Sequence, residues 1–158
     1  MSLDIMRGLL RDFGASIGLP ELEPDDDGYC CLRIGDHVTV SLQYEPEGRD
    51  LALFAKLCRI PQQFRFEAYE MMLAGNLFWA QTKGGTLAVE PSEGVVFLLM
   101  KEKLQAMDFS RFNALLEGFV EAAEDWQRRL EAVSEEIEDR RSDASGLYPA
   151  SLSHRRLQ

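Results

Sequence analysis

The chain has 158 residues, of which 46% are hydrophobic, so it is long enough and apolar enough to fold as one globular domain with a core. Its formal net charge of -10 argues against a nucleic-acid partner, because binding a phosphate backbone needs clustered Lys and Arg. No stretch is apolar enough to span a bilayer, and Asp4, Arg7, Arg11 and Asp12 interrupt the segment that a signal peptide would need. An odd number of cysteines suits a reducing cytoplasm rather than a disulfide framework.

The first part of the chain predicts one helix and three strands. Apolar residues recur at helical spacing from Leu3 to Ile17, and Gly18 followed by Pro20 is a stop signal. The acidic segment 21–28 predicts a solvated turn. Strands are expected at residues 29–34, 37–44 and 51–60; the second alternates apolar and polar residues, whereas the third is partly apolar on both faces.

The middle of the chain predicts a second helix and a β-hairpin. Pro61 opens the helix, which is expected to run to Gln81 and to end before Gly84-Gly85. The hairpin is expected at residues 86–90 and 95–100, with its second strand apolar on both faces. One stripe of the helix is expected to carry Phe66, Tyr69, Leu73, Leu77 and Ala80.

A third helix is expected after Asp108, which can cap it. Its apolar stripe fits either a coiled-coil seam or a face that packs across the sheet, and the second interpretation is favoured. The sequence turns polar from Ser134, so we expect one domain over residues 1–133 and a polar, flexible tail over residues 134–158. The stripe consists of Phe109, Phe112, Leu116, Phe119, Ala123, Trp126, Leu130 and Val133.

Residues able to carry chemistry do not form a recognisable catalytic or metal-binding set. His37 and His154 lack Cys or carboxylate neighbours at metal-ligand spacing. Cys30 and Cys31 are adjacent on a predicted strand and therefore point to opposite faces. The segment TKGGT (82–86) follows a helix and precedes a strand, which is the opposite order to a phosphate-binding loop. We therefore expect no enzymatic activity, no metal and no cofactor.

Surplus apolar residues are the informative feature of the sequence. A core between a sheet and helices can absorb some of them, and the remainder predict contact with another protein. They are Phe54, Val96, Leu98 and the run Leu77-Phe78-Trp79.

Three segments in order resemble the CesT/Tir-chaperone family, the class I chaperones of bacterial type III secretion. The first, LLRDFGASIGLPELEPDDDGYCCLRI, joins a helix ending in Phe-Gly to an acidic turn and a strand. The second, LAGNLFWAQTKGGTLAVEPSEGVVFLL, joins a helix end to Gly-Gly and a hairpin, and the third, DFSRFNALLEGFVEAAEDWQRRL, contains an A-x-x-W helix. The resemblance covers about residues 2–133 and leaves the tail unexplained.

This resemblance implies an α+β domain in the order helix, three-stranded antiparallel meander, helix, β-hairpin, helix, which forms a cytoplasmic homodimer without ATPase activity. Such a dimer binds the N-terminal region of a secreted effector in extended form, with the secretion ATPase and sorting components as further candidate partners. A regulatory dimer on the same fold, which sequesters a protein controlling secretion-gene expression, remains the alternative. By the resemblance, the dimer contact would use Leu73, Leu77, Phe78, Leu87 and Val89, and the client would contact Leu10, Phe13, Phe54, Val96 and Leu98.

Overall fold

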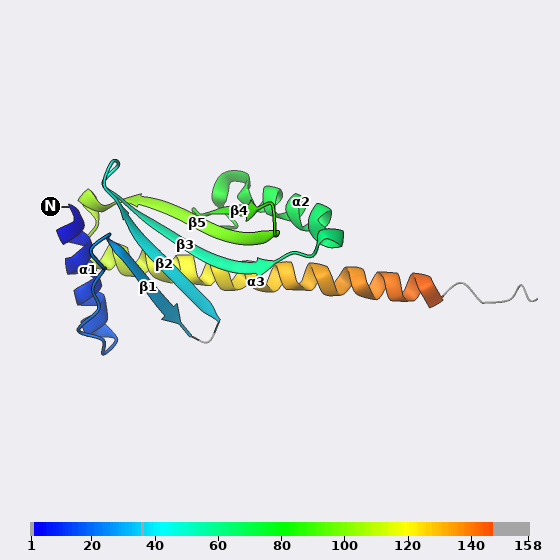
Figure 1. The fold of residues 1–158 in the computed structure, drawn as a ribbon, viewed down its shortest axis with the longest axis horizontal. Coiled ribbons are helices and arrows are strands. Elements are labelled where there is room, and N and C mark those ends of the chain that lie inside the picture. Colours follow the sequence, from blue (N-terminus) through cyan, green and yellow to red (C-terminus); the bar gives the residue numbers. More distant parts are fainter. Residues whose placement is uncertain (1, 36, 147–158) are drawn as a thin grey trace, which may run out of the picture.

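The computed structural model describes residues 2–35 and 37–146 and confirms the predicted α+β class (Figure 1). Short 3-10 turns η1 (Gln62–Phe64), η2 (Leu77–Trp79) and η3 (Leu104–Ala106) flank the longer elements. Those elements are α1 (Ser2–Ser16), β1 (Tyr29–Ile34), β2 (Val38–Glu45), β3 (Asp50–Arg59), α2 (Arg65–Asn76), β4 (Thr86–Glu90), β5 (Val95–Lys103) and α3 (Phe109–Gly146).

The five strands form one antiparallel sheet in the order β1-β2-β3-β5-β4. At its centre, Phe54 lies opposite Ser41 on one side and Leu99 on the other. At the β4 edge, the side chain of Asn76 bonds both backbone groups of Leu87: Nδ2 donates to the carbonyl (3.0 Å), and the Leu87 N–H donates to Oδ1 (2.8 Å). The end of α2 therefore takes the place of a further strand at this point, whereas β1 pairs on one side only.

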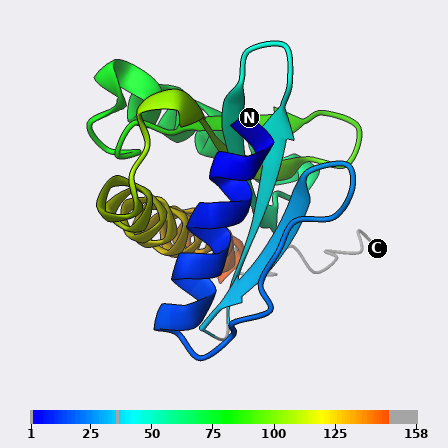
Figure 2. The same cartoon turned by 90° about the vertical axis from the view of Figure 1, so that its left-hand side faces the viewer.

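One face of the sheet is covered by α1 and α3, which lie on the same side of the strands (Figure 2). The predicted stripe of α3 packs across the sheet as expected, with Phe112, Phe119 and Trp126 fully buried. Phe13 of α1 meets Phe112 edge-on, with 6.0 Å between ring centroids. The expected domain boundary at Val133 lies inside α3, which continues to Gly146; residues 147–158 of the predicted tail lie outside the described residues.

The second helix differs from the prediction in length and in its buried face. It ends at Asn76, because the backbone of Phe78 turns into the left-handed region (φ 58°, ψ 13°). Its buried residues are Ala68, Met72 and Gly75, whereas Leu73 is 73% exposed. The expected stripe was wrong for Phe66, Leu73, Leu77 and Ala80, because α2 packs through the face that carries Ala68, Met72 and Gly75 and turns Phe66 and Leu73 to solvent.

Trp126 explains why small residues are needed there. Its indole is fully buried, lies against Gly75 of α2 and donates from Nε1 to the backbone carbonyl of Gln81 (2.9 Å). A Cβ added to Gly75 would overlap the indole ring. The guanidinium of Arg129 lies 5.1 Å from the centre of the Trp126 ring and also donates to the Gln81 side chain (3.0 Å).

Four expected interaction residues are part of the core, which corrects their assignment. Leu10, Val96 and Leu98 are fully buried, and Leu87 is 4% exposed, so none of them presents a side chain to a partner. For β5 the reason is register: Leu98 lies opposite Ala55 on the covered face, so the open face carries Phe97 and Leu99 instead. The prediction from the sequence placed Val96 and Leu98 on the open face of β5, whereas they lie on its covered face.

Replacing Gly75 by Ala is expected to lower the free energy of unfolding by about 1–3 kcal/mol, because the added methyl must displace the Trp126 ring from a filled core. Urea unfolding measures this change. Gly118→Ala in α3 is the matched control, because the methyl would meet only the side chain of Lys83 at ordinary contact distance (3.8 Å). That control should be neutral or stabilising; equal effects of the two substitutions would contradict the packing described here.

Candidate interaction surfaces

Within residues 2–35 and 37–146, no group of three or more His, Cys, Asp or Glu side chains could hold a metal ion. Burial, together with the nearby Glu131 carboxylate, raises the pKa of Cys58 to about 11, and burial also raises the pKa of Cys30, so both thiols stay protonated at neutral pH. In the same ranges, no helix is both long and apolar enough to cross a membrane.

An exposed run of apolar side chains follows α2. Leu77, Phe78 and Trp79 are 64%, 82% and 56% exposed, so none of them closes the core as the sequence suggested. Phe78 and Trp79 both have positive φ angles (58° and 54°), which side chains other than Gly rarely adopt. The backbone thus holds two strained aromatic residues with their rings in water, an arrangement typical of functional surfaces.

Residues 81–85, which follow this run, are held to the rest of the protein by hydrogen bonds and an ion pair. The Thr82 hydroxyl is buried and donates to the Gly85 carbonyl (2.5 Å), Lys83 forms an ion pair with Glu121 of α3, and Trp126 holds Gln81. The run is therefore presented on a supported turn. We call the exposed apolar side chains here the α2 surface: Phe66, Leu73, Leu77, Phe78 and Trp79.

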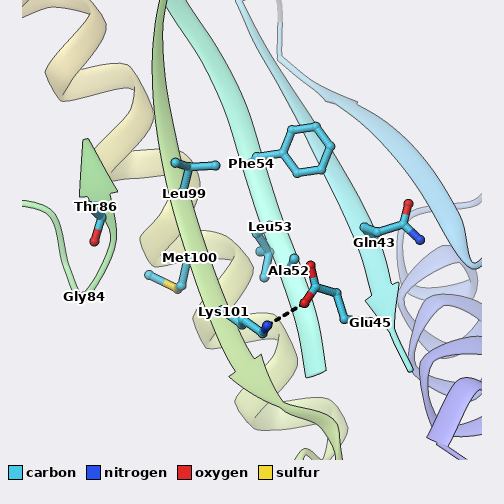
Figure 3. A pocket seen from close by; sticks show the side chains of 10 residues that line it. All are labelled: Gln43, Glu45, Ala52, Leu53, Phe54, Gly84, Thr86, Leu99, Met100 and Lys101. Carbon is cyan, nitrogen blue, oxygen red and sulfur yellow. Dashed lines mark hydrogen bonds and ion pairs between the residues drawn. The ribbon is translucent and has the colours of Figure 1, made fainter. Parts of the chain in front are cut away.

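The open face of the sheet carries a second surface, a hollow of about 500 Å³ (Figure 3). Phe54 and Leu99 lie side by side across β3 and β5 and give the hollow its apolar character; Phe54 is half-buried and Leu99 is 39% exposed. Leu53 is buried, so Phe54 points away from the core as expected. We call this the outer sheet hollow, and it is lined by Gln43, Glu45, Ala52, Leu53, Phe54, Gly84, Thr86, Leu99, Met100 and Lys101.

Charged groups close one end of the outer sheet hollow. Lys101 Nζ lies 2.5 Å from Glu45 and 3.5 Å from Asp50, and the hydrogen bond that Lys101 donates to Glu45 is the main reason that the pKa of Lys101 is raised. The hydrogen bond from Lys103 (2.8 Å) is the main reason that the pKa of Asp50 is lowered. Lys101 and Asp50 are therefore ionised at neutral pH and form ion pairs within the chain, which leaves Phe54 and Leu99 as the apolar side chains that the hollow offers to a ligand.

A third surface is a groove of about 400 Å³ between α1, the end of β1 and α3. Phe13 and Ile34 form one side of this groove, and both are half-buried. Phe13 was predicted as a client contact and does line a cavity. We call this the α1–α3 groove; its α3 side consists of Asn113, Leu116, Glu117, Val120 and Glu121.

The sequence missed several residues of these surfaces. Leu99 neighbours Leu98 on β5 and therefore points to the opposite face of the sheet. Both faces of that strand are apolar, so the sequence pattern did not show which one is covered. Phe66 was placed on an α2 stripe and not assigned to a contact, yet it is 77% exposed. Val89 of the expected dimer contact is half-buried on β4 beside the buried Leu87.

An α+β domain with open apolar surfaces has the properties of a protein-binding module. The chain belongs to the Tir chaperone protein (CesT) family, whose family model matches residues 8–127. It is 28% identical over 124 residues to the Chlamydia pneumoniae protein CPj0713/CpB0740, an alignment that covers 77% of this chain and 93% of that protein.

Solved structures share the same architecture. The ExsC–ExsE complex contains a chain with a TM-score of 0.67 and 25% identity, over 79% of this chain and 92% of that one. The HopA1–SchA chaperone–effector complex gives a TM-score of 0.62 and 24% identity, over 81% and 97% of the two chains. The Yersinia pestis type III secretion chaperone SycH, bound to a fragment of YscM2, gives a TM-score of 0.59 and 20% identity, over 76% of this chain and 98% of that one. The last two likenesses establish the fold alone.

Phe78 offers a direct test of the strained turn. Phe78→Asn should keep a free energy of unfolding up to about 1 kcal/mol above that of Phe78→Val, because Asn tolerates the left-handed conformation. Phe78→Val should be the less stable of the two, because a β-branched residue is poorly accommodated at positive φ. Both variants lack the ring, so the difference between them in urea unfolding reports the backbone alone. Equal stability of the two variants would show that residue 78 is not held in this conformation.

Proposed function

We propose that this protein is a cytoplasmic chaperone of bacterial type III secretion, which binds the N-terminal region of a secreted effector in an extended, secretion-competent form and catalyses no reaction. Membership of the Tir chaperone family supports the class of activity. The observation that carries the proposal is the outer sheet hollow, because Phe54 and Leu99 lie half-buried or exposed on a sheet face without a covering helix. An extended segment can fill such a hollow with its side chains.

The way in which a segment is held follows from the sheet. Strand β1 forms one edge and pairs only with β2, so an extended client can add backbone hydrogen bonds there. Near its start this edge is already occupied, because Asp25 and Tyr29 exchange hydrogen bonds. The remaining part of β1 lies beside the α1–α3 groove through Ile34. A client that pairs with β1 would therefore place side chains within reach of the groove.

The α2 surface is assigned to a second copy of the chain. The segment that follows Leu77, Phe78 and Trp79 is held by Thr82, Lys83 and Gln81, so little backbone entropy is lost when the run is buried. Contact across a two-fold axis brings the same patch of each copy together, as in most homodimers. Leu73, Leu77 and Phe78 are exposed and suited to this contact, and Val89 lies on the neighbouring strand.

The family resemblance also fits a regulatory dimer, which would bind a protein that controls secretion-gene expression. Copurification from the native host separates the two functions: an effector N-terminal segment identifies a chaperone, and a transcription activator or its antagonist identifies a regulator. The secretion ATPase and sorting components are further partners that the same experiment would recover.

Leu77→Asp is expected to convert the dimer to a monomer, because the carboxylate would be buried unpaired at the contact. Light scattering at micromolar concentration measures the mass. Ile17→Asp is the matched control: Ile17 is 50% exposed at the end of α1, and the substitution should leave the dimer intact. A wild-type monomer, or a dimer that survives Leu77→Asp, would remove the α2 surface from the contact.

Phe54→Glu is expected to weaken client binding by more than about tenfold, because filling the hollow around such a ring contributes roughly 1.5–3 kcal/mol. The dimer and its Tm should stay nearly unchanged, since Phe54 lies on the open face. Calorimetric titration with the effector N-terminal segment and thermal melting of the free protein are the two measurements. Thr39→Glu, an exposed position on β2 outside the hollow, is the control. Unchanged affinity would exclude Phe54 from the site, and a collapse of Tm would show that Phe54 belongs to the core.

A further inference from the structure

The α1–α3 groove combines an apolar floor with an acidic rim. Its α3 side uses positions spaced by three and four residues, so the side chains of one helical stripe face the groove. Leu116 and Val120 are buried at its base. Glu117 and Glu121 are exposed at its edge, one turn apart.

The two rim carboxylates differ in their partners. Glu121 is held by Lys83, although about half of each side chain remains exposed. Glu117 forms none of the ion pairs or hydrogen bonds found among the described residues, so its charge is available to a ligand. The chain as a whole carries a net charge of -10, which adds a long-range attraction for cations.

We propose that the α1–α3 groove selects client segments in which an apolar side chain is flanked by Lys or Arg. The apolar side chain would pack on Phe13 and Ile34, and the aliphatic stem of the basic residue would lie along the rim with its charged end beside Glu117. This inference rests on the proposed function, and it adds the charge of the segment that is recognised.

A second copy of the chain fits the groove less well. The exposed apolar side chains of α2 stand beside Glu67 and Glu70, which are also exposed. Docking that helix in the groove would bring these carboxylates towards Glu117, and like charges brought together lower affinity. A basic, extended peptide satisfies the groove without this repulsion.

The probes are three fluorescein-labelled peptides with the same apolar sequence, in which the residues on either side of a central Leu-Val pair are Lys, Gln or Glu. Fluorescence anisotropy with the full-length wild-type protein should give affinities in the order Lys, Gln, Glu, with at least about tenfold between the first and the last. Raising the ionic strength from about 0.1 M to about 1 M should shrink this ratio, because the Debye length falls from about 10 Å to about 3 Å.

Glu117→Gln should reduce affinity for the Lys peptide by about two- to fivefold, as expected for one exposed ion pair, and Glu117→Lys should reduce it by about tenfold. Glu124→Lys makes the same change in net charge on α3 outside the groove and should leave the ratio nearly unchanged. Ile34→Ser should weaken all three peptides by a similar factor, because it alters only the apolar wall.

Four outcomes would overturn the inference. Equal affinities for the three peptides would exclude charge selection, and equal effects of Glu117→Lys and Glu124→Lys would assign it to net charge rather than to the groove. Loss of dimer in Glu117→Lys, seen by light scattering, would identify the groove as a contact between copies. Absence of binding by any peptide would exclude the groove as a client site. The proposed function is tested separately by Phe54→Glu: loss of client affinity in that variant, together with no effect of Glu117→Lys on the peptides, would overturn this inference and leave the proposed function standing.

Discussion

The buried indole of Trp126 is the contact on which the arrangement of the surfaces depends. It packs against Gly75 of α2, bonds the carbonyl of Gln81 and belongs to the α3 stripe that covers the sheet. One side chain therefore joins the sheet-covering helix, the short helix and the strained turn after it. Because α2 packs through the face that carries Ala68, Met72 and Gly75, its other large apolar residues, Phe66 and Leu73, are left in solvent. The exposure of the α2 surface is thus a consequence of how the core is packed.

The sequence predicted most of the fold, because the longest element has the clearest pattern. Apolar residues in α3 recur at alternating steps of three and four, and those side chains are buried as expected. The face of α2 was not predictable in the same way, since two of its three buried residues, Ala68 and Gly75, carry little hydrophobic signal, and large apolar residues lie on both faces. The two faces of β5 are both apolar, so periodicity could not distinguish Leu98 from Leu99. Only the register with β3 decides between them.

The outer sheet hollow and the α1–α3 groove differ in charge as well as in position. The ion pairs at the end of the outer sheet hollow are satisfied within the chain, so that hollow offers mainly apolar contact. Glu117 at the α1–α3 groove has no such partner within residues 2–35 and 37–146 and offers charge. A ligand that spans both sites would gain affinity chiefly from apolar burial and selectivity chiefly from electrostatics. Such separation allows the two properties to vary independently through different substitutions.

The hydrogen bonds between Asn76 and Leu87 make the two edges of the sheet unequal. A sheet with two free edges can accept a strand at each, and repeated pairing of that kind produces fibres. Here the side-chain amide of Asn76 holds both backbone groups of Leu87, which a further strand would need in the middle of its pairing with β4. Pairing at β1 alone joins at most two sheets and then stops. The blocked β4 edge thus works against open-ended polymerisation of the sheet.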